Sequence, residues 1–166
     1  MVDLEIHPTR PDEAPALVAA GGQAEYVADR LTRQAAGHGV LLVAWLDGRA
    51  VGSVYLWLAP AEEAEIREHL PGAPLITHLE VFAADRNQGF GTQLVEAAER
   101  ELRKLERTVA ALAVELSNVD AARLYKRLGY QDWGHDRVFC VQRAWTADGT
   151  LLEKHEECTV LVKLLG

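Results

Sequence analysis

The sequence predicts a mixed α/β (α+β) fold, in which a mostly antiparallel central sheet of about seven strands is flanked by helices. Three observations lead to this prediction. Short β-branched and aromatic runs alternate with longer runs of helical periodicity along the chain. Asp-Gly pairs at residues 47–48 and 148–149 separate apolar runs, as hairpin turns do. A strand-like run, residues 75–83, leads through a glycine-containing turn into a helix-like run, residues 90–105.

The first part of the chain predicts a strand, two helices and a hairpin. Val2 to His7 is strand-like, and a helix follows from about Asp12 to Ala20, with Asp12 as its N-cap. Residues 24–36 place apolar side chains at near-helical spacing, which predicts a second helix. The apolar runs 40–46 and 50–58 then form the two arms of the first hairpin.

The second part alternates strands and helices before a final hairpin. Residues 61–70 form an acidic, helix-like insert bounded by prolines. After the strand, turn and helix of residues 75–105, strand 109–116 leads into a short helix at 119–128, and an antiparallel pair surrounds residues 148–149. The predicted order is β-α-α-β-β-β-α-β-α-β-β. An apolar stripe would dock the longest helix on the sheet, formed by Phe90, Leu94, Ala98, Leu102 and Leu105.

The composition is that of one globular domain. The 166 residues are 49% hydrophobic, which is enough for one sizeable core, so we expect a single domain over residues 1–166. Cys140 and Cys158 lie outside any CxxC spacing, and so few cysteines are typical of reduced thiols. The six histidines show no helical metal-ligand pair, so no metal is expected.

Charge and the N-terminal sequence restrict partners and location. The net charge of −8 argues against binding to nucleic acid and favours the approach of cationic amines, although negative charge also promotes solubility in general. Met1 to Glu5 contain no apolar signal segment, and no later apolar run approaches the roughly 18 residues of a spanning helix. We therefore expect a cytoplasmic protein with neither membrane nor nucleic acid as a partner, and a homodimer is left open.

The turn formed by residues 85–92 is the strongest chemical signal. Gly89 and Gly91 allow backbone N–H groups to come close to a ligand, and the helix start adds partial positive charge, as a pyrophosphate site requires. An isolated pair of glycines more often forms an ordinary tight turn. A Rossmann site is disfavoured by Leu94, which stands where that fingerprint has Gly or Ala. A P-loop is excluded because no lysine follows a glycine.

Two motifs, in the same order as in the family, give the chain a resemblance to the GNAT family of N-acetyltransferases. Residues 86–91, Arg-Asn-Gln-Gly-Phe-Gly, resemble its motif A, Arg-x-x-Gly-x-Gly, where this turn holds the pyrophosphate of acetyl-CoA. Residues 118–130 resemble the family's Asn-x-x-Ala-x-x-Leu-Tyr-x-x-x-Gly-Phe segment. The predicted order of elements is also that of the family's fold. The resemblance therefore implies that acetyl-CoA is the cosubstrate.

The resemblance also implies which residues contact acetyl-CoA. In the family the strand before the turn has a bulge and separates from its neighbour, so the main-chain groups of Val81 and Ala83 would pair with the pantetheine arm. Asn118 would cap its helix and touch the same arm. Ala84 and Asn87 depart from the proline and glycine common in the family, but both essential glycines remain. The pyrophosphate would be lined by Arg86, Asn87, Gln88, Gly89, Phe90, Gly91 and Thr92.

Three side chains are candidates for proton transfer. Tyr125 matches the family position that often protonates the departing thiolate, and a phenol with an ordinary pKa of about 10 can donate at neutral pH. Glu80 is the first choice for accepting the proton of the amine, directly or through water. His78 shares its face unless a bulge intervenes, and is an orienting partner or an alternative base. All three also have structural interpretations, as a packed tyrosine, a solvated carboxylate and a hydrogen-bonded histidine.

Two functions are compatible with these residues. The first is an acetyl-CoA-dependent N-acetyltransferase that acts on a primary amine of a small molecule or peptide. The second is a noncatalytic acyl-CoA-binding regulatory protein of the same fold. Tyr125 favours the enzyme, and Trp57 is expected to face the substrate. The carboxylates of the insert form either a rim that collects cationic amines or a solvated helix face, and they are Glu62, Glu63, Glu65 and Glu68.

Overall fold

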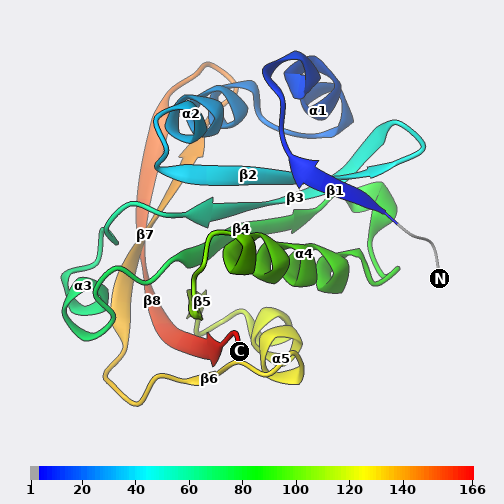
Figure 1. Cartoon of the computed structure of the whole chain (residues 1–166). Coiled ribbons are helices and arrows are strands. Elements are labelled where there is room, and N and C mark those ends of the chain that lie inside the picture. The colour runs from blue at the N-terminus through cyan, green and yellow to red at the C-terminus, as the bar shows by residue number, and fades with distance from the viewer. Residues whose placement is uncertain (1–3) are drawn as a thin grey trace.

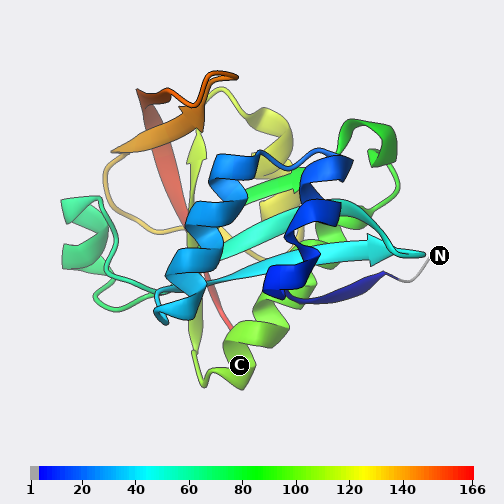
Figure 2. The same cartoon turned by 90° about the horizontal axis from the view of Figure 1, so that it is seen from above.

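The computed structural model describes residues 4–166 and contains one open, eight-stranded sheet with helices on both faces (Figures 1 and 2). The strands lie in the order β1-β2-β3-β4-β5-β8-β6, and β7 also pairs with β8. Every pairing is antiparallel except that of β4 with β5. The predicted mixed, mostly antiparallel sheet is therefore confirmed. It has one strand more than expected, because the two-residue strand β6 leaves no hydrophobic pattern.

The predicted elements are present, with bounds that shift by a few residues. The strands are β1 (Glu5–Pro8), β2 (Gly39–Leu46), β3 (Arg49–Trp57), β4 (Leu75–Val81), β5 (Val109–Glu115), β6 (Gln131–Asp132), β7 (Val138–Trp145) and β8 (Leu151–Leu164). The helices are α1 (Ala14–Ala20), α2 (Ala24–Ala35), α3 (Ala64–His69), α4 (Phe90–Lys104) and α5 (Val119–Arg127), with 3-10 turns η1 (Pro11–Glu13) and η2 (Ala83–Asp85).

Two expectations about helix ends are wrong, and the predicted start of the first strand lies outside the described residues. The predicted first strand begins at Val2, which is not among the described residues. Asp12 does not cap a helix, because it lies within η1, where the backbone N–H of Arg10 donates to the Glu13 carboxylate at 2.8 Å. Leu105 is 41% exposed and does not continue the apolar stripe, because α4 has already ended.

Both Asp-Gly pairs form the predicted hairpins. Asp47 and Gly48 have positive φ angles of 52° and 80°, as the tight turn between β2 and β3 requires. Gly149 also has a positive φ, 84°, in the turn between β7 and β8. β8 is longer than β7, and its second half pairs with β5 from Val109 to Glu115. This long strand therefore connects the final hairpin to the rest of the sheet.

The two faces of the sheet are covered by different helices. β2 and β3 are buried along most of their length, which explains their nearly continuous apolar sequences. α1 and α2 pack on one face around Tyr26, Val27 and Tyr55, whereas α4 and α5 pack on the opposite face around Leu94 and Tyr125. Figure 2 shows α1 and α2 in front of the sheet and α4 behind it. A smaller cluster beside α3 contains the two buried, free cysteines.

The neighbouring strands β4 and β5 separate soon after they meet. Leu75 and Ala111 form the one ladder pair between them in the described chain. Between Thr77 and Glu80, β4 advances by three residues while the paired part of β3 advances by two. β4 therefore contains a bulge. His78 lies in this bulge with a left-handed φ of 51°. The bulge and the separation that the family resemblance implies are thus present.

A buried polar network connects α4 to the end of the chain. Glu99, 4% exposed, accepts hydrogen bonds from the Tyr130 hydroxyl at 2.8 Å and from Lys163 Nζ at 2.9 and 3.1 Å. Burial and the adjacent Glu99 carboxylate raise the pKa of Tyr130, so its phenol remains a donor. The network fixes the rotation of α4 on the sheet, because a buried carboxylate is costly without these partners.

Tyr130→Phe should lower the free energy of unfolding by about 1–3 kcal/mol, because it removes a hydrogen bond to a buried carboxylate. Tyr55→Phe is a matched control, since the Tyr55 hydroxyl is also buried but has no hydrogen-bond partner within the described residues. We expect this control to leave stability unchanged or slightly higher. Urea unfolding of both variants measures the difference, and equal losses would contradict a stabilising role for the network.

Candidate functional site

The turn between β4 and α4 has the geometry of an anion cradle. Asn87 and Gly89 have left-handed φ angles of 63° and 80°, and Gly89 is the N-cap of α4. The first N–H groups of a helix have no partner within it, and residues 86–89 are exposed. Asparagine tolerates the left-handed conformation better than most residues, which explains how Asn87 replaces a glycine here. The turn therefore presents N–H groups and the positive end of a helix at the surface.

Glycine at position 89 is explained by the backbone conformation, whereas glycine at position 91 is explained by the space that it leaves at the helix start. Its φ angle is not positive, so the backbone does not require glycine. An added Cβ would lie 3.7 Å from Leu124 and 3.9 Å from Val81, which are ordinary contacts. The protein thus has room for a methyl group at this position, and the missing side chain leaves the helix start open. Both glycines fit a bound pyrophosphate.

An ion pair between the exposed Arg49 and the buried Asp85 holds the beginning of the turn. Asp85 is 4% exposed, and Arg49 of β3 donates to its two carboxylate oxygens at 2.8 and 3.0 Å. The hydrogen bonds from Arg49 lower the pKa of Asp85 below its ordinary value, so the pair stays ionised. Sequence reasoning missed this contact, because the two residues lie on separate elements and belong to no motif.

The chain after β4 differs from the expected extended run. Val81 ends the strand, and its carbonyl accepts a hydrogen bond from Arg86 Nε at 3.1 Å. Ala83 lies in the 3-10 turn η2 rather than in a strand, so the prediction that the strand continues to residue 83 is wrong. The reason is Phe82, whose side chain is buried in the α1/α2 core and draws the chain away from β5. Val81 is therefore beside the separated strands, whereas Ala83 is on an exposed turn.

A cavity of about 300 Å³ lies where β4 and β5 separate. Asn118 and Tyr125 line it from α5, and Arg30 and Trp57 line it from α2 and the end of β3. Because α5 and α2 pack on opposite faces of the sheet, the cavity passes between the strands from one face to the other. The predicted site tryptophan, Trp57, is thus in the cavity wall.

Tyr125 and Asn118 occupy the positions that the second motif predicts. The Asn118 side chain caps α5 by accepting a hydrogen bond from the Ala121 N–H at 3.2 Å. Tyr125 is 7% exposed, and its ring contacts Tyr130 edge-on at 5.7 Å. Burial raises the pKa of Tyr125 to about 12, so the phenol is protonated at neutral pH. No residue in the described chain hydrogen-bonds to its hydroxyl, which leaves this donor available at the cavity.

His78 and Glu80 lie together on the face that α2 covers. Although His78 lies in the bulge, its side chain stays close to that of Glu80, because His78 Nε2 is 3.9 Å from a Glu80 carboxylate oxygen. The His78 ring stacks on Tyr26 at 4.2 Å, and burial together with the positive charge of Arg30 lowers the pKa of His78 to about 4. Burial raises the pKa of Glu80, an effect that Arg86 partly opposes. His78 is among the described residues of the cavity wall, and Glu80 is not.

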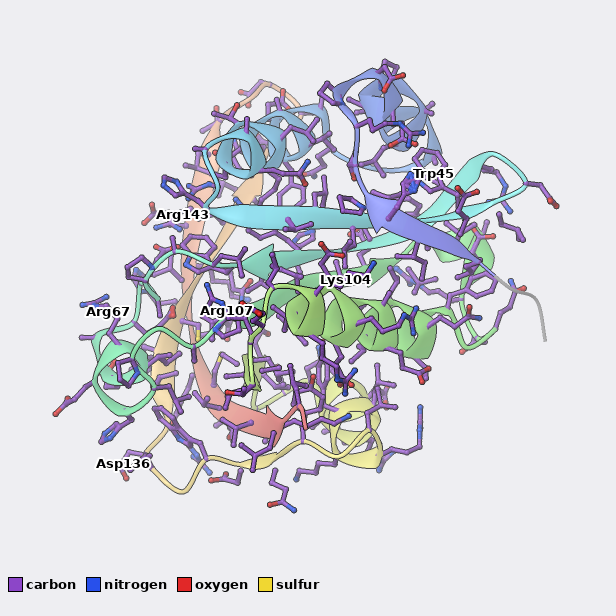
Figure 3. The ribbon with its side chains drawn as sticks, viewed as in Figure 1. Trp45, Arg67, Lys104, Arg107, Asp136 and Arg143 are labelled. Carbon is purple, nitrogen blue, oxygen red and sulfur yellow. The ribbon has the colours of Figure 1, made fainter. Side chains whose placement is uncertain are left out.

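The acidic insert contributes less to the site than its composition suggests. Glu62 reaches the cavity, but Arg143 of β7 binds both its carboxylate oxygens at 2.8 and 2.7 Å. Figure 3 shows Arg143 on the side of the molecule where β3 ends. Glu65 and Glu68 are exposed on α3 and are not among the described residues of the cavity wall. Only Glu62 and Glu63 of the insert therefore meet the cavity.

Sequence reasoning missed three further side chains of this region. Arg30, Tyr26 and Arg143 come from α2 and β7, which carry no recognisable motif. The helical spacing around Tyr26 predicts burial but not which strand it meets. Within the described residues, no group of three His, Cys, Asp or Glu side chains is arranged to hold a metal ion. None of the helices in residues 4–166 has the length and apolar character needed to cross a bilayer.

Comparisons with known proteins agree with this geometry. Residues 6–130 match the family model described as Acetyltransferase (GNAT) family. No curated protein sequence matches the chain. An N-acetyltransferase from Staphylococcus aureus is similar in structure with a TM-score of 0.68 at 13% identity, over 99% of this chain and 100% of that one. A ribosomal-protein-alanine N-acetyltransferase from Brucella melitensis gives a TM-score of 0.69 at 19% identity, over 97% and 99%.

A third similar structure, a GNAT family acetyltransferase from Elizabethkingia anophelis, was solved with acetyl-CoA bound. Its TM-score is 0.64 at 17% identity, over 99% of both chains. At such identities these structures establish the shared fold. The family model covers most of the chain and includes both the turn at residues 85–92 and the segment that ends at Tyr130. The chain therefore belongs to the GNAT family of acetyltransferases.

Proposed function

We propose that this protein is an acetyl-CoA-dependent N-acetyltransferase, which transfers an acetyl group to a primary amine by direct attack in a ternary complex. The observation that carries the proposal is the cavity between β4 and β5, with Tyr125 in its wall on one face of the sheet and His78 in its wall on the other. The anion cradle opens beside the same strand. Membership of the GNAT family and the acetyl-CoA bound to the Elizabethkingia anophelis protein support this assignment.

The cradle and the end of β4 would hold acetyl-CoA. The N–H groups at the start of α4, from Gly89 to Thr92, would bind the pyrophosphate, and Arg86 would add positive charge after leaving the Val81 carbonyl. Val81 and Asn118 would hold the pantetheine arm beside the separated strands. When bound there, acetyl-CoA supplies a thioester whose acyl carbon is attacked by the neutral amine and whose C–S bond breaks.

The proton transfers are assigned to the three predicted side chains. Glu80 accepts the proton that the amine must lose, and His78, which lines the cavity and lies 3.9 Å away, connects the carboxylate to the amine. The raised pKa of Glu80 makes it a stronger base than an ordinary carboxylate. Tyr125 gives its proton to the departing thiolate. Its buried phenol remains protonated well above neutral pH.

The competing function is a noncatalytic acyl-CoA-binding protein, since a fold and a cofactor site do not by themselves guarantee turnover. Incubation with acetyl-CoA and a panel of amines and peptides distinguishes the two. Amine-dependent release of the CoA thiol supports the enzyme. Calorimetric binding of acetyl-CoA without such release across the panel would favour the noncatalytic protein.

Gly91→Ala should weaken acetyl-CoA binding about tenfold or more without destabilising the fold. The protein leaves room for the added methyl group, and alanine is the better helix former, so the loss would come from the ligand alone. Gly91→Glu should weaken binding further, because it adds negative charge beside the pyrophosphate. Calorimetry measures the affinity, and unfolding in urea is the control. Unchanged affinity in both variants would remove the cradle from the proposal.

Tyr125→Phe should lower kcat by about a hundredfold and leave acetyl-CoA affinity nearly unchanged. The variant keeps the buried ring and loses a hydroxyl that has no hydrogen-bond partner in residues 4–166, so stability should not fall. Steady-state kinetics with a thiol reagent measures the effect. A variant that retains the wild-type kcat would show that the phenol does not act as an acid.

Glu80→Gln should depress kcat/KM most at low pH and recover partly at high pH, where more of the amine is already neutral. His78→Asn should produce a similar profile, since asparagine tolerates the left-handed backbone of the bulge. If the two side chains act in one relay, the double variant should be no slower than the slower single variant. Losses that multiply would indicate separate roles, and a profile parallel to that of the wild type would exclude Glu80 as the base.

A further inference from the structure

Arg30 is in the cavity wall and lies among three aromatic rings. Its guanidinium carbon lies 4.6 Å from the ring centre of Tyr26, 4.7 Å from that of Tyr55 and 5.9 Å from that of Trp57. Such stacking restricts the plane of the guanidinium, so its N–H groups have a fixed direction. A planar fork of this kind matches a carboxylate better than a lysine would.

Polar atoms around Arg30 lack acceptors. One terminal nitrogen of Arg30 pairs with Asp29 at 2.5 Å. Its Nε and the hydroxyls of Tyr26 and Tyr55 are buried without a hydrogen-bond partner in the described structure. Arg30 lies in the cavity wall, whereas the two tyrosines are not among its described residues, so the guanidinium is the donor that an acceptor oxygen in the cavity can reach.

Arg143, the other arginine in the described cavity wall, has acceptors for its guanidinium. Arg143 binds Glu62 through two nitrogens at 2.8 and 2.7 Å, and its Nε lies 3.3 Å from a Glu153 oxygen. These two carboxylates already supply the acceptors that its guanidinium requires. Of these two arginines, Arg30 is therefore the one that still has N–H groups without an acceptor in the described residues.

The proposed amine position is close to Arg30. His78 and Arg30 contact the same ring, with Tyr26 4.2 Å from the imidazole centre and 4.6 Å from the guanidinium carbon. The cavity also contains the carboxylates of Glu63 and Glu115, which suit an incoming ammonium group. Its volume of about 300 Å³ is at the small end of ligand sites. The same cavity wall thus carries a guanidinium and carboxylates, as a ligand with both an ammonium and a carboxylate group requires.

We propose that Arg30 binds a carboxylate of the acceptor, so that the substrate is a small amino-acid-like amine rather than a purely cationic one. This inference rests on the proposed acetyltransferase function and specifies its substrate class. Arg30 acts in specificity, because it holds the carboxylate while His78 and Glu80 face the amine. Glu62 of the acidic insert, paired with Arg143 of β7, then forms part of the cavity wall. The insert does not act as an open rim that collects cationic amines.

The test compares each proteinogenic amino acid with its primary amide and with its decarboxylated amine, with CoA thiol release as the readout. The wild-type protein should give a kcat/KM at least about tenfold higher for the best acid than for its amide. Arg30→Gln should abolish this preference, so that the ratio of kcat/KM for the acid to kcat/KM for its amide falls at least about tenfold, toward one, while acetyl-CoA affinity stays nearly unchanged. Any effect of the lost charge on the pKa of His78 is common to acid and amide and cancels in this ratio. Arg30→Lys, which keeps the charge without the fork, should retain part of the preference and serves if Arg30→Gln folds poorly.

Arg33→Gln is the matched control. Arg33 lies on the same helix, stacks on Trp57 at 5.1 Å and also pairs with Asp29, but it is not among the described residues of the cavity wall. The Arg33→Gln variant should keep the wild-type preference for the acid over its amide. Equal rates for acids, amides and decarboxylated amines in the wild type would overturn the carboxylate site while leaving the acetyltransferase function standing. Acetyl-CoA binding without thiol release for any amine or peptide tested would overturn that function, and with it this inference.

Discussion

The separation of β4 from β5 is the constraint on which the candidate site depends. Two neighbouring parallel strands would normally continue their ladder, yet here they share the single pair Leu75 and Ala111 in the described chain. β5 is held on its other side by a full antiparallel ladder with β8, and the bulge at His78 redirects β4. Backbone groups along the open part of β4 then lack a strand partner. Such groups are costly when buried, so the gap is a natural place for an extended ligand.

The cradle is positioned by contacts on both sides of this gap. Arg49 and Asp85 fix the beginning of the turn to β3, and Glu99 fixes α4 through Tyr130 and Lys163. None of these residues is in the described part of the cavity wall, so they set geometry without using groups needed for chemistry. The Glu99 network contributes more to a defined arrangement than to net stability, because the cost of burying its carboxylate cancels much of the attraction to Lys163.

Burial shifts the pKa values of the side chains at the cavity. It raises the pKa of Tyr125 and of Glu80, and together with the charge of Arg30 it lowers the pKa of His78. These three shifts share a cause, which is the loss of solvent around each ionised form. In the proposed function, the α5 side of the site would supply the proton donor and the α2 side the base. Arg30 adds positive charge, which also lowers the pKa of His78.

Short-range patterns were sufficient for much of the fold and for the cradle. The Asp-Gly hairpins, the cap at Asn118 and the left-handed turn at Asn87 and Gly89 depend on residues within a few positions of one another, and the structure contains each of them. The apolar stripe of α4 failed only at Leu105, where the helix had ended. Local sequence determined these features because turn geometry and helix capping involve neighbouring backbone groups.

Other features were decided by the tertiary structure. The bulge at His78 depends on the register between β3 and β4, and the turn at Ala83 depends on where Phe82 is buried. The surroundings of Arg30 combine α2 with β3, and the partner of Glu62 comes from β7 at the opposite end of the sequence. Sequence alone thus determined the fold class, the glycine turn before α4 and the family. The neighbours of Arg30 and of Glu62, and the N–H groups of Arg30 that stay without an acceptor in the described residues, followed only from packing. Packing brings together residues that share no local pattern.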